Sequence, residues 1–225
     1  MGSKRFPGKV TADLDGLPIL VHCIRRLRKI NTAVPVIVAT SDLDQDDAIA
    51  SMSCNESARV FRGSEPDVLD RFYKTAREYE ADYIVRATAD NPFVDPDEGM
   101  RVVEAIRSGS YDYVSGFESA ESRKLPVGVG LEAFTFRTLR RSWLDGHLPH
   151  HREHVNEYIL EHPRKFSIHH LPCRPQNNGP DLHLTVDTHK DLEDIKIMVT
   201  KCGKPALELQ TQDLIRWHQL QTVTL

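Results

Sequence analysis

The chain has 225 residues, enough for one domain with a full hydrophobic core. Apolar residues make up 40% and charged residues 28%, as in an ordinary soluble globular protein, and the formal net charge of −4 argues against a nucleic-acid-binding surface. No stretch approaches the roughly 18 consecutive apolar residues of a membrane span and no signal peptide precedes the first motif, so we expect neither a membrane nor a nucleic acid as a partner.

The first half of the chain alternates helix and strand patterns. Residues 17–30 repeat apolar side chains at helical spacing, and residues 34–40 form a short β-branched run typical of a buried parallel strand. Strands separated by helices indicate βαβ units, and hence an α/β fold with a mainly parallel sheet. The same criteria predict further strands at 58–61, 83–88 and 111–115 and further helices at 44–52, 67–79 and 96–107.

The rhythm changes after Gly116, where a polar stretch with proline and glycine precedes a predicted strand at 131–136. We interpret residues 117–165 as a small inserted subdomain that covers one end of the sheet and is the place to expect a dimer contact. The chain as a whole, residues 1–225, is expected to form a single domain. After a helix at 155–161, its remaining predicted elements are a strand at 182–186 and helices at 191–200 and 212–220.

The four cysteines are spread along the chain without a Cys-x-x-Cys pair. This spacing favours reduced thiols over a disulfide framework or a zinc site. We therefore expect a cytoplasmic protein. The four are Cys23, Cys54, Cys173 and Cys202.

The first nine residues place three cations (Lys4, Arg5, Lys9) and two glycines (Gly2, Gly8) on one short segment without an acidic residue. Glycine lets backbone N–H groups approach a ligand closely, and the fixed positive charge suits a polyphosphate. The spacing differs from a P-loop, because no Gly-Lys-Ser/Thr follows a run of four residues. Taken by itself, the segment is equally consistent with a disordered basic terminus.

Two carboxylates directly follow predicted strands, Asp90 after 83–88 and Asp187 after 182–186. Ligands of open α/β sheets bind at the carboxyl ends of strands, and Mg²⁺ prefers carboxylates together with phosphate oxygens and waters. Either acid alone is more often a turn residue or a helix N-cap. The pair, combined with a phosphate-binding segment, favours a magnesium site.

The run at 61–71 carries helix-entry signals, because Ser64 or Asp67 is suited to cap a helix and Gly63 to form the preceding bend. Local structure leaves the flanking Arg62 and Arg71 unexplained.

Taken together, these segments resemble the cytidylyltransferase family, most closely the spore coat polysaccharide biosynthesis protein F type, with CMP-N-acetylneuraminate synthetase and 3-deoxy-manno-octulosonate cytidylyltransferase as more distant relatives. The resemblance implies a three-layer, Rossmann-type fold of the nucleotide-diphospho-sugar-transferase kind. It also implies a transferase that moves CMP from CTP to an acceptor and releases pyrophosphate. The matching segments, in the family's order, are 2–9, 38–41, 62–71, 86–92, 152–155 and 184–188.

The resemblance also implies roles for single residues. Arg5 and Lys9 would hold the triphosphate, and Gly2 and Ser3 would donate further hydrogen bonds to it. Asp90 and Asp187 would bind Mg²⁺, so that Arg5, Lys9, Asp90 and Asp187 form the expected catalytic set. The nucleotide itself is expected to contact Ala39, Thr40, Ser41, Arg62, Gly63, Ser64, Asp67 and Thr88.

On the acceptor side the resemblance implies an acidic sugar, a polyol phosphate or a phosphonate. Glu132 falls in the family's Gly-x-Glu region and is expected near the acceptor, although an exposed strand position is an equal alternative. Asn91 stands where relatives often carry cysteine, and Arg152 and His154 are expected to contact an anionic acceptor or a subunit partner. The histidines at 147–154 suggest a metal cluster at first sight, but the family matches at 152–155 without zinc, so we do not expect a metal there.

The family carries an apolar strand directly before the Gly-Ser motif, whereas this sequence begins at Met1. We expect that strand to precede Met1, because losing a central strand would expose two sheet edges.

Two other functions stay open: a nucleotidyltransferase of the same fold that uses UTP or GTP, and a non-catalytic nucleotide-binding subunit. A glycosyltransferase fits less well, because Asp90-Asn91-Pro92 is not an Asp-x-Asp motif. The resemblance implies a homodimer.

Overall fold

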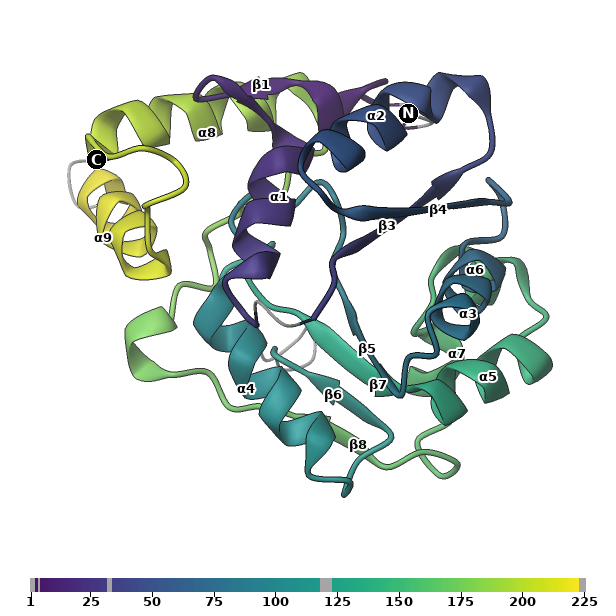
Figure 1. Ribbon diagram of the computed structural model, residues 1–225. Helices are drawn as coiled ribbons and strands as arrows, with labels where there is room; N and C mark the ends of the chain where they lie inside the picture. The colour runs from purple at the N-terminus through teal and green to yellow at the C-terminus, as the bar shows by residue number, and fades with distance from the viewer. Residues whose placement is uncertain (1–2, 4, 32–33, 118–122, 223–225) are drawn as a thin grey trace.

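The computed structural model describes residue 3 and residues 5–31, 34–117 and 123–222 (Figure 1). The strands are β1 (Asp13–Leu14), β2 (Leu17–Pro18), β3 (Ile37–Ser41), β4 (Arg59–Gly63), β5 (Tyr83–Arg86), β6 (Tyr113–Ser115), β7 (Glu132–Thr135) and β8 (Ile168–His170). The α-helices are α1 (Ile19–Arg28), α2 (Asp47–Asn55), α3 (Val68–Glu78), α4 (Pro96–Arg107), α5 (Phe136–Asp145), α6 (Pro149–Glu153), α7 (Glu157–Leu160), α8 (His189–Cys202) and α9 (Thr211–Thr222). Short 3₁₀ helices are η1 (Lys9–Thr11), η2 (Asp44–Asp46) and η3 (Pro175–Asn177).

The largest sheet has four strands in the order β5-β7-β6-β8 among the described residues. Strands β6 and β8 are parallel, while β7 runs antiparallel to both of its neighbours, so the sheet is mixed. A second, parallel pair joins β3 to β4, with Ser41 opposite Gly63 at its carboxyl end. The α/β class is therefore confirmed, and β7 shows that part of the 117–165 segment belongs to the sheet itself.

The sheet is covered on both faces, which gives the three-layer arrangement. Because strand residues alternate between faces, one row of neighbouring side chains (Ile84, Phe134, Tyr113 and Ile168) packs against α3, α5 and α7. The alternate row (Val85, Ala133 and Val114) packs against Val102 and Ile106 of α4. Figure 1 shows α3, α5, α6 and α7 gathered on one side, with α8 and α9 at the opposite edge beside the C-terminus.

The helix α4 follows directly from its sequence. The Asp95 side chain accepts hydrogen bonds from the N–H groups of Asp97 and Glu98, and Pro96 occupies the first helical position. Both are favoured at helix starts, so α4 has the bounds that its pattern predicts. Among the described residues, no helix is both long and apolar enough to cross a membrane.

The predicted strand at 182–186 is wrong as a regular element. Leu182, Leu184 and Val186 are buried as a strand would bury them, yet the segment forms only one isolated bridge, between His183 and Val127. The ladder cannot continue, because Pro126 lacks an N–H and Gly128 adopts a positive φ of 91°. The helix predicted at 155–161 is likewise shorter, since α7 spans Glu157–Leu160 only.

Candidate active site

The N-terminal segment turns sharply into the molecule at Gly8. Its φ of 74° lies in the left-handed region that glycine adopts without strain, and the Gly8 carbonyl accepts hydrogen bonds from the Thr11 N–H and hydroxyl. The Phe6 ring stacks on His189 of α8 with 3.8 Å between ring centroids. This turn directs Lys9 toward the end of β5 and the start of α8.

Asp90 and Asp187 are brought together by the backbone. The Val186 N–H donates a 2.9 Å hydrogen bond to the Asp90 carbonyl, so residue 187 lies beside residue 90. Thr188, and not Asp187, is the N-cap of α8, and its side chain accepts a hydrogen bond from Asp191 N–H. The Asp187 carboxylate therefore does not cap the helix, and it faces the basic segment.

Lys9 lies between the two carboxylates. Its Nζ is 2.6 Å from Asp90 Oδ2 and 3.0 Å from Asp187 Oδ1, and Arg5 Nη2 is also 3.0 Å from Asp187 Oδ1. Burial by itself lowers the pKa of Lys9, but the hydrogen bonds and charges of Asp90 and Asp187 outweigh it, and the net pKa is raised. The structure thus brings the four expected catalytic residues into one cluster.

One carboxylate oxygen of Asp90 does not take part in the contact with Lys9. Its Oδ1 is buried and has no hydrogen-bond partner among the described residues. An unpaired buried carboxylate oxygen is costly unless a cation or donor reaches it. The oxygen-only donors of Asp90 and Asp187, already arranged around one ammonium cation, fit a hard divalent ion such as Mg²⁺.

A cavity of about 250 Å³ opens beside this cluster. Glu132 lies in its wall and is 5% exposed; its Oε2 is 3.0 Å from Arg86 Nη1 and its Oε1 accepts a 2.9 Å hydrogen bond from Asn156. Burial, followed by the charge of Glu132, raises the pKa of the neighbouring Tyr113 well above its ordinary value. Besides Arg86 and Glu132, polar residues lining the cavity are Thr88, Asp90, Asn91, Arg123, Thr185 and Asp187.

Besides Asp90 Oδ1, two more side-chain atoms at this cavity lack partners among the described residues. The Arg123 guanidinium lies over the Phe117 ring, 5.5 Å from its centroid, and its Nε is buried without a hydrogen-bond partner. Asn91 donates to Thr88 Oγ1 at 2.9 Å, which leaves its buried Oδ1 without a donor. The cavity therefore offers an unused donor and an unused acceptor.

The predicted nucleotide contacts at 39–41 lie at the carboxyl end of β3, where Asp46 holds the backbone. One oxygen, Oδ2, accepts hydrogen bonds from the Thr40 hydroxyl (2.7 Å), the Ser41 hydroxyl (2.6 Å) and the Ser41 N–H (3.0 Å). Burial tends to raise the Asp46 pKa, but hydrogen bonds, those from Thr40 and Ser41 among them, outweigh it and hold the pKa far below its ordinary value. Thr40 and Ser41 therefore belong to a rigid strand end.

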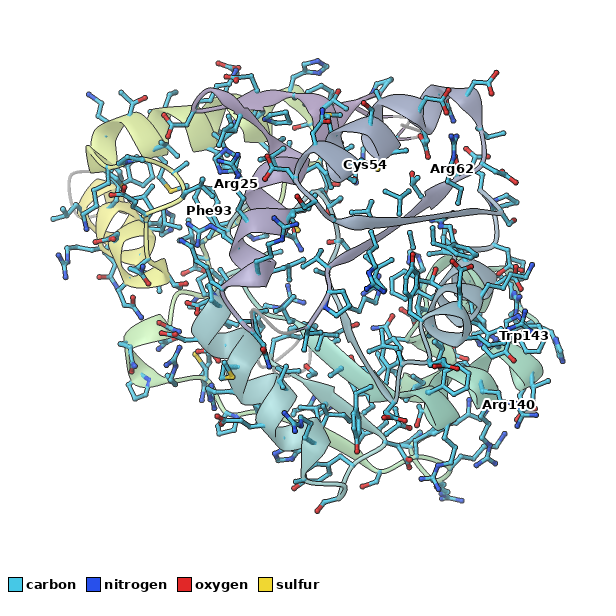
Figure 2. All side chains as sticks on the ribbon, viewed as in Figure 1. Arg25, Cys54, Arg62, Phe93, Arg140 and Trp143 are labelled. Carbon is cyan, nitrogen blue, oxygen red and sulfur yellow. The ribbon has the colours of Figure 1, made fainter. Side chains whose placement is uncertain are left out.

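Two arginines connect this strand end to its surroundings. Arg62 donates to the Ser41 carbonyl at 3.0 Å and to the Leu43 carbonyl at 2.7 Å, and Figure 2 shows it on the α2 side of the molecule. Arg71 donates to the Ala39 carbonyl at 3.1 Å and to the Ser64 carbonyl. Gly63 lies beside Arg71, because a Cβ built on it would be 3.5 Å from Arg71 Cγ.

Arg152 and His154 are placed elsewhere. Arg152 donates two hydrogen bonds to Asp67 Oδ2, of 2.9 and 2.6 Å, and a third to the Trp143 carbonyl on α5, the helix that Figure 2 marks with Trp143 and Arg140. His154 is exposed just after α6. Neither residue lines the 250 Å³ cavity. Ser3 accepts a hydrogen bond from the Phe6 N–H, and Gly2 lies outside the described residues.

Asp46 and Arg123 are among the site-forming residues that the sequence pattern did not single out. Asp46 looked like one of several acids at a helix start, and Arg123 stands in a polar stretch without periodicity. For Arg62 and Arg71, the sequence signal is their position on either side of the Gly63-Ser64 bend, which local structure alone does not explain.

A family model described as cytidylyltransferase matches residues 1–216. The spore coat polysaccharide biosynthesis protein SpsF of Bacillus subtilis is 34% identical over 209 residues, which cover 91% of this chain and 85% of that protein. An uncharacterised protein of Methanocaldococcus jannaschii is 36% identical over 192 residues, 85% of this chain and 76% of its own length. A 3-deoxy-manno-octulosonate cytidylyltransferase of Anaeromyxobacter is 31% identical over 110 residues, 48% of this chain and 44% of that enzyme.

Solved structures show the same fold. A cytidylyltransferase from Leptospira borgpetersenii superposes with a TM-score of 0.89 at 28% identity, covering 99% of this chain and 92% of its own. A CMP:2-keto-3-deoxy-manno-octonic acid synthetase solved with CTP has a TM-score of 0.65 at 19% identity and covers 89% of this chain and 95% of its own. At that identity the second likeness concerns the fold alone.

Proposed function

Because the chain belongs to the cytidylyltransferase family and is thus a nucleotidyltransferase, we propose that it transfers CMP from CTP to an anionic small-molecule acceptor in a Mg²⁺-dependent reaction. The acceptor classes are an acidic sugar, a polyol phosphate or a phosphonate. The observation that carries the proposal is the cluster of Arg5 and Lys9 around Asp90 and Asp187 beside a polar cavity.

In this reaction an acceptor oxygen forms a bond to the α-phosphorus of CTP, and the bond from that phosphorus to the bridging oxygen breaks to release pyrophosphate. Such transfer depends on positioning and charge neutralisation more than on covalent chemistry. Lys9, held at the end of a tight turn, would bind triphosphate oxygens, and the exposed Arg5 would reach the outer phosphates. Asp90 and Asp187 would hold Mg²⁺, which when bound supplies further positive charge to the phosphates.

The nucleoside would lie against the ends of β3 and β4. Asp46 Oδ2 accepts hydrogen bonds from Thr40 and Ser41, and two arginines donate to backbone carbonyls of this edge. The backbone groups at 39–41 and 62–64 are therefore held in position for a base and a ribose. The basic segment is adjacent, because Val10 packs in the same cluster as Val38 of β3 and Ala89. One nucleotide could therefore reach both regions.

The acceptor would occupy the 250 Å³ cavity. Arg123 Nε, which has no partner among the described residues, supplies a donor for an anionic group, while Glu132 and the Asn91 amide oxygen supply acceptors for hydroxyl groups. Arg152 and His154 lie away from this cavity, so they would affect acceptor binding only indirectly or would lie at a subunit contact. A homodimer with its contact in the 117–165 segment, and a cytoplasmic location, belong to the same proposal.

A nucleotide panel tests the proposal. Thermal unfolding would be followed with CTP, UTP, GTP and ATP, each with and without Mg²⁺; a ligand at about 100 times its Kd adds roughly 2.7 kcal/mol to stability. We expect a CTP-selective shift that Mg²⁺ increases, followed by pyrophosphate release when an anionic acceptor is added. A UTP- or GTP-selective shift would replace the proposed donor, and nucleotide binding without pyrophosphate release for any acceptor class would indicate a binding subunit.

A further inference from the structure

A second cluster of metal-binding side chains lies outside the proposed active site. His150 and His151 of α6 and Glu161, which directly follows α7, place three potential ligand atoms within 4.8 Å of one another. His150 Nε2 is 2.7 Å from Glu161 Oε1, and His151 Nε2 is 2.7 Å from Glu161 Oε2. We propose that these three residues form a binding site for a divalent transition-metal ion of the zinc type.

The geometry of the histidines supports a site over a chance surface contact. Consecutive side chains on a helix point in directions about 100° apart, yet both rings here turn the same nitrogen, Nε2, toward one carboxylate. The ring centroids are 4.3 Å apart. His151 is 4% exposed and packs edge-on against Tyr158, so one ligand is held rigidly by the core. Glu161 and His150 are partly exposed and able to adjust.

The two histidine–carboxylate contacts need to open only slightly to admit an ion. Tetrahedral zinc with ligand bonds of about 2.0–2.1 Å separates its ligand atoms by about 3.3 Å, slightly more than the present contacts. His151 Nδ1 accepts a long 3.4 Å hydrogen bond from the Leu148 N–H, which assigns the ring proton to Nε2. Metal binding at Nε2 would move that proton to Nδ1 and end this weak contact, a modest loss against a metal–nitrogen bond.

The donor set identifies the class of ion. Two imidazoles and one carboxylate suit Zn²⁺, Co²⁺ and Ni²⁺, whereas Mg²⁺ prefers oxygen ligands alone. Three protein ligands leave at least one coordination position for water. The site is also chemically distinct from Asp90 and Asp187, which offer oxygen donors only.

The ion would join α6 to the end of α7. Arg152, the next residue of α6, turns away from the cluster and binds Asp67, the N-cap of α3. A metal that fixes α6 would therefore also support the segment that holds Asp67 at the edge of the proposed nucleotide site.

Co²⁺ is the probe for the test, because four-coordinate Co²⁺ has strong visible absorption bands. The tag-free, chelator-treated protein would be titrated with Co²⁺ in millimolar Mg²⁺, so that oxygen-only sites are filled, and the bound Co²⁺ would then be displaced with Zn²⁺. The test variants are His150→Ala and Glu161→Gln, both at partly exposed positions. His147→Ala is the matched control, since His147 is an exposed histidine of the same stretch outside the cluster.

We expect one equivalent of Co²⁺ to produce the four-coordinate bands in the parent protein and in His147→Ala, and Zn²⁺ to abolish them. His150→Ala and Glu161→Gln each alter a direct ligand, so we expect binding to weaken by at least about 100-fold, the most that loss of an outer-shell partner costs. Circular dichroism would verify that both variants are folded. Absence of Co²⁺ binding in the parent protein, or equal binding in His150→Ala, would overturn the proposal. Neither result bears on nucleotide binding, so this test is independent of the proposed function.

Discussion

The backbone carbonyl of Asp90 accepts a 2.9 Å hydrogen bond from the N–H of Val186. This bond joins the loop after β5 to the segment that enters α8 and sets Asp187 beside Asp90, where both carboxylates face the ammonium group of Lys9. An irregular segment thus performs the alignment that a regular strand at 182–186 was expected to provide.

Substitution of Lys9 should strongly impair catalysis at the proposed active site. Lys9→Ala removes the cation held between two carboxylates, and by analogy with loss of a preorganised transition-state donor we expect kcat/KM to fall by about 10²–10³. Arg5→Ala should cause a loss of the same order. Pyrophosphate release measures both, with the exposed Lys201→Ala as control. Unchanged turnover in both variants would exclude the segment from catalysis.

Asp90→Asn should change the Mg²⁺ dependence of activity while the protein stays folded. The amide keeps the shape of the side chain but removes the charge from a buried oxygen that has no partner among the described residues. We expect the Mg²⁺ concentration needed for half-maximal activity to rise by at least about 10-fold, since one of two hard anionic ligands is lost. Chelation with EDTA should abolish activity in the parent protein, and added Mg²⁺ should restore it. An unaltered Mg²⁺ titration in Asp90→Asn would contradict the assignment.

Asp46→Asn should affect both stability and CTP binding. It replaces an anion that accepts hydrogen bonds from Thr40 and Ser41 at the end of β3, so we expect a loss of about 1–3 kcal/mol in the free energy of unfolding, measured by urea denaturation. The KM for CTP should rise while the KM for the acceptor changes little. Asp44→Asn, at an exposed position two residues earlier, is the control. Equal stability of the two variants would show that the Asp46 contacts contribute nothing measurable.

Arg152 and Asp67 form an ion pair, and their contributions to the free energy of unfolding should be coupled. The side chains are only about a quarter exposed, 22% and 29%, and share two hydrogen bonds. In a double-mutant cycle with Arg152→Ala and Asp67→Asn, we expect a coupling free energy between about 0.5 and 3 kcal/mol from urea unfolding. If Arg152 instead contacts the acceptor directly, Arg152→Ala should raise the KM for the acceptor without changing stability. That outcome would support the acceptor contact expected from the sequence.

Asp112 should make stability depend on pH. Burial tends to raise its pKa, but hydrogen bonds from the Ser167 N–H and Arg137 outweigh this and lower the net pKa. A carboxyl whose pKa is lower in the folded state stabilises the protein above the unfolded-state pKa of about 3.9, and this contribution is lost as the pH falls through the folded-state pKa. Asp112→Asn should therefore be less stable than the parent protein near pH 7, and the difference should shrink below about pH 4. Urea unfolding at several pH values measures it; a constant difference would indicate lost packing instead.

Local patterns determined much of the fold. The helix at Pro96–Arg107 was predictable because Asp95 and Pro96 define its start and its apolar residues repeat at helical spacing. The β3 and β5 strands were predictable because short β-branched runs favour buried strands. The antiparallel direction of β7 was not, since alternation along a strand is the same in either direction.

The sequence by itself determined which chemical groups are available: cations beside glycines near the N-terminus, acids after apolar runs, and histidines near residue 150. Only the tertiary structure decided their partners. Lys9 meets Asp90 and Asp187 across 81 and 178 positions, Arg152 meets Asp67 across 85, and the histidines of α6 meet Glu161. Such contacts depend on how the layers pack around a common core, and periodicity within one element carries no information about which distant element will lie against it.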